Sequence, residues 1–220
     1  MMKKLMTTFL LMGAASVTAA TDQLWRQSED TALSTHLAAL PLASTPQVEA
    51  LLQNKLLNDP LSPVVGATNP VLRIVSFVNY DCIHCQQFDV NLEKLLKAHP
   101  QIAITYKLIS YGSGASTAAT RMALTVWIEQ PEKFHAFHRA LMASSAMAGD
   151  ERIHYALSTA GVKLSKYRPD TQHIIDMNKA LLRKLHYSAT PTTFIGDRVI
   201  SGAVPYEELE RAVTAALKDV

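Results

Sequence analysis

The sequence predicts an α/β fold with an inserted helical subdomain and an N-terminal helical extension. A strand pattern at 72–78 leads into a helical pattern that ends before Pro100, and a second strand pattern follows at 102–109. That order is typical of two parallel strands joined by a right-handed helical crossover. A long helical section then separates this β-α-β unit from a closing β-β-α unit.

The first residues have the pattern of an export signal. Lys3 and Lys4 precede an apolar stretch over 5–17, and small residues follow at 18–20. This pattern is typical of a cleaved secretory signal and is too short for a membrane span. We therefore expect residues 1–20 to be removed and the mature protein to be soluble in the periplasm.

Two helical patterns follow, one over 22–40 and one after Thr45, and we assign residues 21–58 to an N-terminal helical module. Residues 59–70 contain three prolines and a glycine, which indicates a linker. The module is too small to bury its apolar stripes alone. It therefore either packs on the main domain or forms a homodimer or homotrimer through residues 22–58.

The main domain is predicted at 71–220, and both cysteines lie at its first strand-to-helix junction, in a Cys-Ile-His-Cys unit. A Cys-x-x-Cys pair in that position is typical of a redox site. Cys82 falls at the helix N-terminus, where free N–H groups and the macrodipole favour a thiolate. Cys85 lies one turn later and can close a disulfide. His84, when protonated, adds positive charge near the thiolate.

A structural disulfide is the plain alternative for these two cysteines. Such a bridge would close a loop with only two intervening residues, so it would constrain the unfolded chain little. Export places the pair in an oxidising compartment, and the chain has no other cysteine. We therefore favour redox chemistry.

The rest of the main domain follows from helical and strand periodicity. Four helical patterns form an insertion at about 113–187, with Asp150 expected to cap the third helix. Strand patterns at 192–195 and 198–201 flank a Gly-Asp pair, which indicates a two-residue hairpin. Pro205 is expected to begin the last helix.

The charge balance argues against nucleic-acid binding. The chain has 21 Lys+Arg and 19 Asp+Glu, and the predicted signal contains two lysines and no acid. The mature chain is therefore neutral with His uncharged, and it has no basic run of the kind that binds nucleic acid.

Several separate segments together carry a family resemblance over about residues 59–219. They are an opening Ser-Pro-Val-Val-Gly at 62–66, the strand and motif at 77–85, the four-helix insertion, and Ala-Thr-Pro-Thr-Thr-Phe-Ile at 189–195. In this order the chain resembles the DsbA-type thiol–disulfide oxidoreductases, which are thioredoxin-fold proteins. The resemblance implies that Pro191 is cis and lies beside the cysteines. It also implies no cofactor besides the redox-active disulfide.

The same resemblance assigns the site residues. Cys82, Cys85, His84 and Pro191 are the expected catalytic residues. Thr190 is expected to present backbone groups to an extended substrate peptide by strand-like pairing.

Two positions depart from the common family pattern. Many members carry a buried acid where this chain has Ser76, so a proton shuttle through such an acid is not supported. Many oxidases have proline where this chain has Ile83, and Thr190 resembles the residue found in disulfide isomerases of this fold. The N-terminal helices resemble the oligomerisation arms of some isomerase-type and copper-tolerance relatives. Oxidase and isomerase activity therefore both stay open.

The sequence thus predicts an exported enzyme that forms or isomerises disulfides in secreted proteins. Its expected partners are unfolded or misoxidised exported proteins and a membrane redox partner, either an oxidase or a reductase. A substrate thiolate would attack Cys82, and the mixed disulfide would then be resolved by a second thiol.

Two other classes of function remain as alternatives. Cys82, His84 and Cys85 are three soft ligands, and His135 and His138 are one helical turn apart, so a periplasmic copper- or zinc-binding or copper-tolerance protein is possible chemically. A structural zinc site, however, needs four ligands and no second Cys-x-x-Cys is present. The third class is a non-catalytic holdase that uses the N-terminal apolar stripes.

Overall fold

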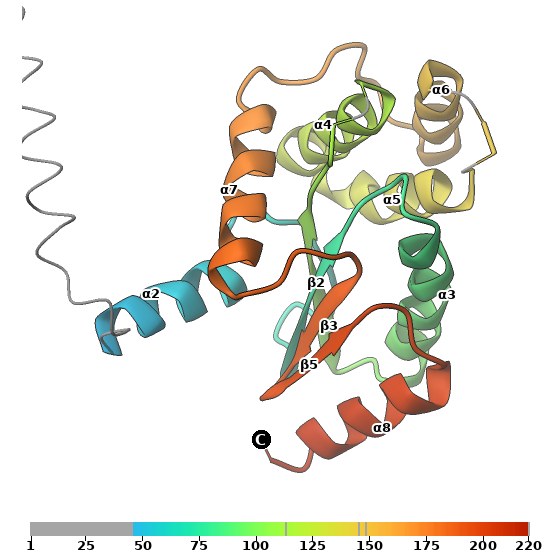
Figure 1. Ribbon diagram of the computed structural model, residues 1–220. Coiled ribbons are helices and arrows are strands. Elements are labelled where there is room, and N and C mark those ends of the chain that lie inside the picture. Colours follow the sequence, from blue (N-terminus) through green and yellow to red (C-terminus); the bar gives the residue numbers. More distant parts are fainter. Residues whose placement is uncertain (1–45, 113, 145, 148, 220) are drawn as a thin grey trace, which may run out of the picture. The chain divides into compact units, whose positions relative to one another are not determined.

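The computed structural model describes residues 46–112, 114–144, 146–147 and 149–219. From Ala50 onward the chain forms one compact unit around a five-stranded sheet with the strand order β1-β3-β2-β4-β5 (Figure 1). Only β2 and β3 are parallel, and every other pair is antiparallel. The strands are β1 (Val64–Gly66), β2 (Leu72–Val78), β3 (Ile102–Leu108), β4 (Thr192–Ile195) and β5 (Arg198–Ser201).

Burial explains the sequences of the central strands. All seven residues of β3 are buried, and in β2 only Arg73 is not. A central parallel pair is covered on both faces, which favours an almost continuous apolar run over strict alternation. β5 lies at the sheet edge and is mostly exposed.

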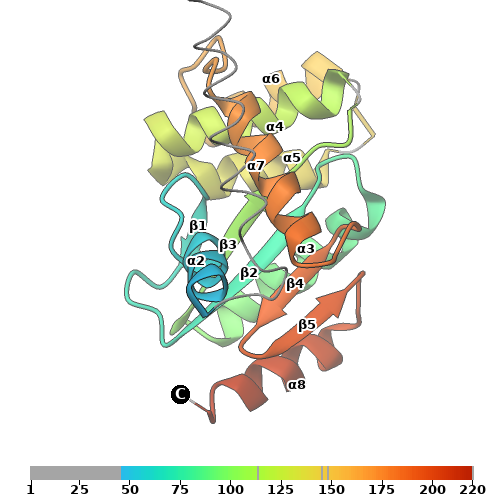
Figure 2. The same cartoon turned by 60° about the vertical axis from the view of Figure 1, so that its left-hand side comes forward.

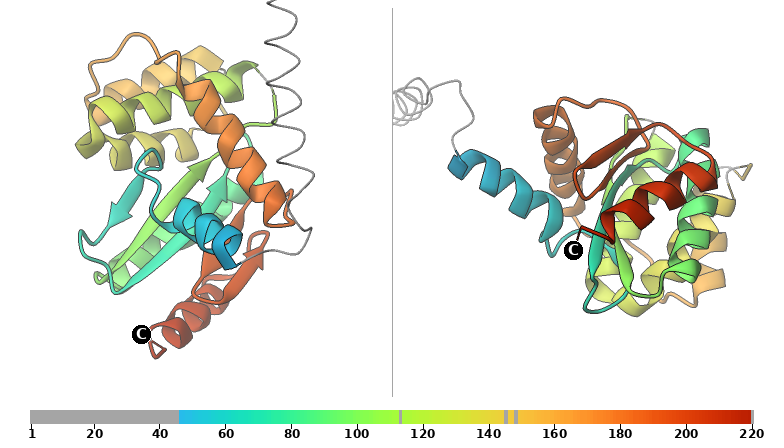
Figure 3. Two further views of the ribbon diagram at one scale, coloured as in Figure 1. Left: turned by 90° about the vertical axis from the view of Figure 1, so that its left-hand side faces the viewer. Right: turned by 90° about the horizontal axis from the view of Figure 1, so that it is seen from below.

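Helices cover both faces of the sheet and one of its ends. Figures 1 and 3 show α3 and α8 on one face, and α7 with residues 50–57 of α2 on the other. Figure 2 shows α4, α5 and α6, three of the four helices of the insertion, gathered at one end of the sheet. The helices are α2 (Pro46–Leu57), α3 (Ile83–Ala98), α4 (Gly114–Glu129), the short 3-10 helix η1 (Pro131–Lys133), α5 (Phe134–Ala143), α6 (Gly149–Ala160), α7 (Thr171–Lys184) and α8 (Tyr206–Ala216).

Two apolar clusters hold these layers together. The larger joins the inner sides of α3, α8 and the insertion to one face of the sheet. The smaller joins the opposite face to α7 and α2, and its buried members are Leu56, Val75, Phe77, Ile109, Leu181 and Leu182. Apolar burial on both faces explains why the order β-α-β, helices, β-β-α is stable as a single layered body.

The predicted α/β fold with a helical insertion is confirmed, and the hairpin strands have the predicted bounds. Some boundaries differ. Residues 64–66, which fall in the predicted linker, form β1 and pair with β3. This strand has only three residues after Pro63, so it is too short to show the alternation by which a strand is recognised in a sequence. At Gly66 φ is +115°, and an added Cβ would lie 2.5 Å from the Ile102 carbonyl oxygen, so glycine is required there.

Two predicted helix starts are shifted by one residue. α6 begins at Gly149, so Asp150 lies in its first turn and is not the cap. Pro205 is the N-cap of α8 and not its first helical residue. The predicted signal at 1–20, the helix at 22–40 and Thr45 lie outside the described residues. In the described part of the chain, no helix is long and apolar enough to cross a membrane.

Candidate active site

Cys82 is the N-cap of α3, as the strand-to-helix pattern predicts. Its backbone is extended, with φ −84° and ψ 112°, and its Sγ accepts a hydrogen bond from the Cys85 N–H at 3.4 Å. The side chain is only half-buried and is unbridged in the structure. A sulfur in this position faces the free N–H groups and the positive end of the helix dipole, which stabilise a thiolate.

Cys85 has the opposite environment. It lies in the first turn of α3 and is only 1% exposed. Burial raises the pKa of the Cys85 thiol from 9.0 to about 12, and the neighbouring Cys82 adds to this shift. The two cysteines therefore differ: Cys82 has an accessible sulfur, whereas Cys85 is a buried, protonated thiol.

The loop before β4 closes over Cys82. The Thr190–Pro191 peptide bond is cis, as the resemblance implies, and Pro191 is buried. The Cys82 thiol donates a hydrogen bond to the Thr190 carbonyl oxygen at 3.2 Å. The structure thus brings together four of the predicted site residues, which come from segments more than 100 positions apart.

His84 is exposed on the first turn of α3. Its neighbour Ile83 is 56% exposed, so the surface next to Cys82 has an apolar as well as a polar component. Of the five predicted site residues, His84 alone is exposed, because Cys82 and Thr190 are half-buried and Cys85 and Pro191 are buried.

Ser76 is fully buried in β2, at the position where many relatives carry an acid. Its hydroxyl forms a 2.8 Å hydrogen bond with the Thr193 hydroxyl in β4. Two hydroxyl groups satisfy each other here without a charge, so this position offers no carboxylate for proton transfer.

A buried polar chain lies behind the active-site helix. The Tyr80 hydroxyl is 2.9 Å from His138 Nδ1, and His138 Nε2 is 3.0 Å from Asp89 Oδ1. Both ring nitrogens of His138 are thus used: Nε2 faces the Asp89 carboxylate and Nδ1 pairs with the Tyr80 hydroxyl. This chain fixes the end of β2 to α3 and α5.

The same contacts remove the histidine pair that the metal alternative would need. His138 is buried in the chain just described, whereas His135 contacts Glu93 at 2.7 Å on the outer side of α5. Across the described ranges, no group of three or more His, Cys, Asp or Glu side chains is arranged to hold a metal ion.

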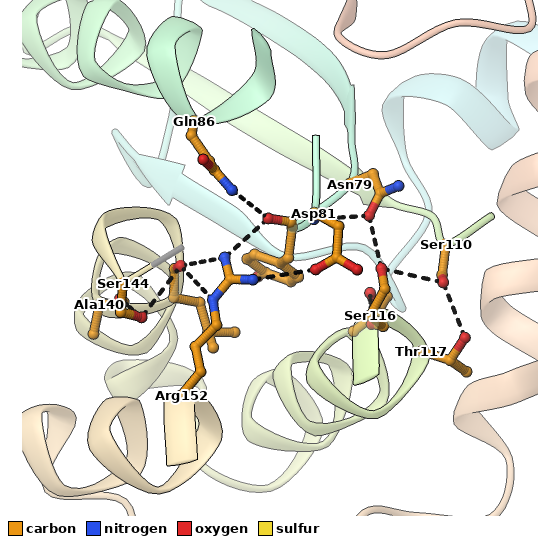
Figure 4. Close-up of polar contacts among 12 residues, drawn as sticks. Asn79, Asp81, Gln86, Ser110, Ser116, Thr117, Ala140, Ser144 and Arg152 are labelled. Carbon is orange, nitrogen blue, oxygen red and sulfur yellow. Dashed lines mark hydrogen bonds and ion pairs between the residues drawn. The ribbon is translucent and has the colours of Figure 1, made fainter. Parts of the chain in front are cut away.

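The turn that leads into Cys82 is held by residues that sequence reasoning missed. Arg152 of α6 donates hydrogen bonds to the Tyr80 carbonyl at 2.9 Å and to Asp81 Oδ1 at 3.2 Å (Figure 4). A signal was present in the sequence. Arg152 occupies the same helical stripe as Ala156 and Ala160, which are buried, and a charge on a buried stripe indicates a specific partner.

Tyr111 is a second residue that the sequence did not single out. It follows β3, and its hydroxyl donates to the Ser188 carbonyl, next to the loop that carries Thr190. The side chain is 53% exposed. Partial burial raises the pKa of Tyr111, and the charges of Cys85 and Cys82 raise it further.

The comparisons with known proteins agree with this geometry. A family model described as thioredoxin matches residues 58–215. A periplasmic thioredoxin-like protein from Salmonella enterica serovar Typhimurium is 37% identical, over 76% of this chain and 97% of that one, with a TM-score of 0.74. The catalytic domain of Proteus mirabilis ScsC is 34% identical, over 80% of this chain and 99% of that one, also with a TM-score of 0.74. The chain belongs to the DsbA-type thiol–disulfide oxidoreductases of the thioredoxin fold.

A curated relative extends the same family. Disulfide bond formation protein D of Bacillus subtilis (strain 168) is 22% identical over 171 residues, which are 71% of this chain and 77% of that protein. Membership of this family agrees with three features of the structure: the cysteine pair at the N-terminus of α3, the cis-proline loop beside it and the helical insertion.

Proposed function

We propose that this DsbA-type oxidoreductase is exported and that it forms or isomerises disulfides in other exported proteins through Cys82 and Cys85. The observation that carries the proposal is the division between the two sulfurs. Cys82 is half-buried at a helix N-terminus, whereas Cys85 is buried with a pKa raised by burial to about 12. The similarity to a periplasmic thioredoxin-like protein and the pattern of residues 1–20 support export.

The oxidation reaction begins with the Cys82–Cys85 disulfide. A substrate thiolate attacks the accessible Cys82 sulfur, a mixed disulfide forms, and Cys85 leaves as a thiolate that takes up a proton. A second substrate thiolate then attacks the substrate sulfur of the mixed disulfide and releases Cys82. Two electrons pass from the substrate dithiol to the enzyme, which ends in the dithiol state.

The high pKa of Cys85 gives this reaction a direction. A buried thiolate is unfavourable, so Cys85 is protonated as soon as it leaves and does not readily attack the mixed disulfide again. The thiolate at Cys82, in contrast, is stabilised at the helix N-terminus. Stabilising the reduced form makes a dithiol–disulfide pair a stronger oxidant.

Thr190 is proposed to bind the substrate backbone. In the reduced protein the Thr190 carbonyl oxygen accepts a hydrogen bond from the Cys82 thiol. In the mixed disulfide Cys82 has no such proton, so the same carbonyl becomes available to a substrate N–H group, in the manner of an added strand. Pro191 holds this carbonyl in place next to the sulfur, and exposed His84 borders the entry path of the substrate.

Oxidation and isomerisation use the same residues in opposite directions, and the surrounding machinery decides between them. An oxidase needs a membrane partner that withdraws electrons, whereas an isomerase needs one that keeps Cys82 and Cys85 reduced. Ile83 and Thr190 are compatible with both directions. The substrates in either case are unfolded or misoxidised exported proteins.

The test compares two refolding reactions catalysed by the same preparation. One starts from a reduced protein with several disulfides, in a glutathione buffer, and the other from its scrambled form. Cys82→Ser should abolish catalysis in both. Cys85→Ser should accumulate mixed disulfides, because it removes even the slow return attack of Cys85 that releases a trapped substrate. Full activity of Cys82→Ser would overturn the proposal.

A further inference from the structure

We infer that Arg152 is a positioning residue for the redox pair. Its guanidinium, which the helical insertion supplies, fixes the turn that carries Cys82 and thereby sets the equilibrium between the dithiol and disulfide states. This inference rests on the proposed function, since its readout is exchange at Cys82 and Cys85.

Arg152 uses all three of its guanidinium nitrogens. The residue is 5% exposed. Nη2 donates to the Tyr80 carbonyl at 2.9 Å, and Nη1 donates to Asp81 Oδ1 at 3.2 Å (Figure 4). Nε donates to the Leu141 carbonyl at 3.0 Å, and Nη2 also donates to this carbonyl, in the last turn of α5. A single side chain thus joins two helices of the insertion to the two residues before Cys82.

The Tyr80 carbonyl is a junction between the insertion and the active-site helix. Besides the Arg152 bond, it accepts a 2.8 Å hydrogen bond from Gln86 Nε2. Gln86 directly follows Cys85 in α3. The carbonyl therefore holds the turn before Cys82 against the first turn of the helix that contains Cys85.

The other side of the turn is held by α4. Asn79 Oδ1 accepts hydrogen bonds from the Asp81 N–H at 3.1 Å and from the Ser116 hydroxyl at 2.9 Å. The Cys82 N–H donates to the Asn79 carbonyl at 3.1 Å. Figure 4 shows Asn79 and Arg152 on opposite sides of Asp81. Contacts from α4 and α6 therefore fix the backbone from 79 to 82 on both sides.

The position of this turn matters because the two redox states need different geometries. In the reduced state the Cys82 sulfur accepts from the Cys85 N–H at 3.4 Å. A disulfide instead requires an S–S distance of about 2.05 Å and a narrow range of dihedral angles. A turn fixed by Arg152 favours the first arrangement. When the turn is loosened, the thiolate loses part of its hydrogen bonding and the disulfide state gains relative to it.

The fork shape of the side chain is essential to this role. A guanidinium presents several donors in a fixed plane, whereas an ammonium is a compact charge on a flexible stem. Lysine at position 152 therefore keeps the charge but cannot reach Leu141, Tyr80 and Asp81 together. If positioning sets the equilibrium, Arg152→Lys should behave like Arg152→Met.

Arg121 provides a matched control within the same insertion. It lies in α4, donates to the Arg168 and Pro169 carbonyls at 3.1 and 3.3 Å, and stacks on Tyr167 with its guanidinium carbon 4.0 Å from the ring centroid. Like Arg152 it binds carbonyl groups with its guanidinium. Unlike Arg152 it holds the loop before α7 and not the cysteine turn.

The experiment equilibrates each reduced protein with glutathione and glutathione disulfide and measures the fraction oxidised. One glutathione disulfide takes two electrons from the dithiol and yields two glutathione molecules and the Cys82–Cys85 bridge. Arg152→Met should shift this equilibrium roughly fivefold toward the bridged protein, the effect of about one lost hydrogen bond. Arg152→Lys should shift it similarly, and Arg121→Met should leave it unchanged.

A second variant protects the test against misfolding. Gln86 is only half-buried, so Gln86→Leu should leave the fold intact, which circular dichroism can verify. It removes the other donor to the Tyr80 carbonyl and should shift the equilibrium in the same direction by a smaller factor. Wild-type equilibria in Arg152→Lys and Gln86→Leu would overturn the inference alone. Failure of the wild-type protein to exchange with glutathione would instead overturn the proposed function.

Discussion

The Cys85 thiol links the stability of the reduced protein to pH. Its pKa is raised by burial from 9.0 to about 12. Below pH 9 the thiol is protonated in both the folded and the unfolded states, so the contribution of Cys85 to the free energy of unfolding does not change with pH. Above pH 9 the unfolded chain releases the proton while the folded protein keeps it until about pH 12. We therefore expect the free energy of unfolding to fall by about 1.4 kcal/mol per pH unit in this window.

The measurement compares urea unfolding of the reduced wild-type protein with that of reduced Cys85→Ala at pH 8 and pH 10.5. Other groups titrate in both proteins, so only the difference between them reports on Cys85. That difference should shrink by about 2 kcal/mol over this interval. Parallel pH dependences in the two proteins would contradict a buried, protonated Cys85.

Tyr111 is expected to support substrate binding through the cis-proline loop. Its hydroxyl donates to the Ser188 carbonyl, two residues before Thr190. Tyr111→Phe keeps the exposed ring but removes this bond, at a cost of about 1 kcal/mol in stability. It should slow oxidation of a reduced peptide several-fold more than oxidation of glutathione, because only a longer peptide can pair with Thr190.

Tyr155→Phe is the control for that prediction. Tyr155 is an exposed tyrosine of similar accessibility in α6, 47% against 53% for Tyr111. Its loss of a hydroxyl should leave both oxidation rates unchanged. Equal slowing of peptide and glutathione oxidation in Tyr111→Phe would assign Tyr111 a role at the cysteines and not at the loop.

At the residue scale, local sequence could identify the groups that lie within one motif. Cys82 and Cys85 are recognisable because a strand, a helix start and their spacing occur together in a few residues. Arg152 and Tyr111 were missed because their partners, Tyr80 and Ser188, are 72 and 77 positions away along the chain. A local pattern can indicate that a side chain has a partner, as the buried stripe of α6 does for Arg152, but it does not identify a partner at that range.

Between elements, a buried ion pair fastens the segment after α2 to β3. Lys107 is fully buried, and its Nζ lies 2.9 Å from Asp59 Oδ2 and 2.7 Å from the Lys55 carbonyl. Burial alone would raise the pKa of Asp59, but the hydrogen bond and charge of Lys107 hold it below its usual value. Burial lowers the pKa of Lys107, and Asp59 opposes that shift. The contacts support an ionised pair at neutral pH.

Asp59→Asn should therefore destabilise the protein by about 3 kcal/mol at pH 7, because it leaves the Lys107 charge buried without its counterion. The double variant Asp59→Asn with Lys107→Met should recover most of this loss, since it removes the charge as well. Urea unfolding of the two single variants and the double variant measures the coupling. The coupling is complete above pH 3.8 as long as Lys107 is charged, and it should vanish as the pH falls below the lowered pKa of Asp59.

Additive losses in the double variant would mean that the two side chains act independently.

The same pair shows why the sequence could not predict every contact between elements. β2 and β3 were predictable as apolar runs bounded by turn residues, and β4 and β5 as short strands on either side of a Gly-Asp turn. A lysine inside the buried run of β3 indicates a partner, but nothing local identifies Asp59, which lies in a segment that reads as a linker.

On the scale of the whole molecule, part of the apolar stripe of α2 is buried against the main domain. Leu56 is 5% exposed, and Leu52 packs against the cluster that contains Phe77 and Leu181. Leu51, in contrast, is 57% exposed. The sequence could predict this apolar stripe but not which of its residues are buried and which are exposed. Periodicity identifies an apolar face but does not show what packs against it.

This division determines where the chain can be shortened. A protein beginning at Val71 would lack β1, Leu56 and Asp59, and it would leave Lys107 without its counterion. We expect it to be several kcal/mol less stable than the mature protein. A protein beginning at Pro46 keeps all of these contacts. It should therefore keep the fold of the main domain and exchange with glutathione at the same rate as the mature protein.

The protein beginning at Pro46 also tests whether residues 21–45 assemble the enzyme. We expect the mature protein to be a homodimer or homotrimer and the shortened one a monomer, as measured by light scattering. Joining several redox sites in one particle raises their effective concentration around a scrambled substrate. Unscrambling should therefore decline on shortening, while oxidation, which needs one site, is retained. Equal masses with both activities unchanged would show that residues 21–45 have no assembly role.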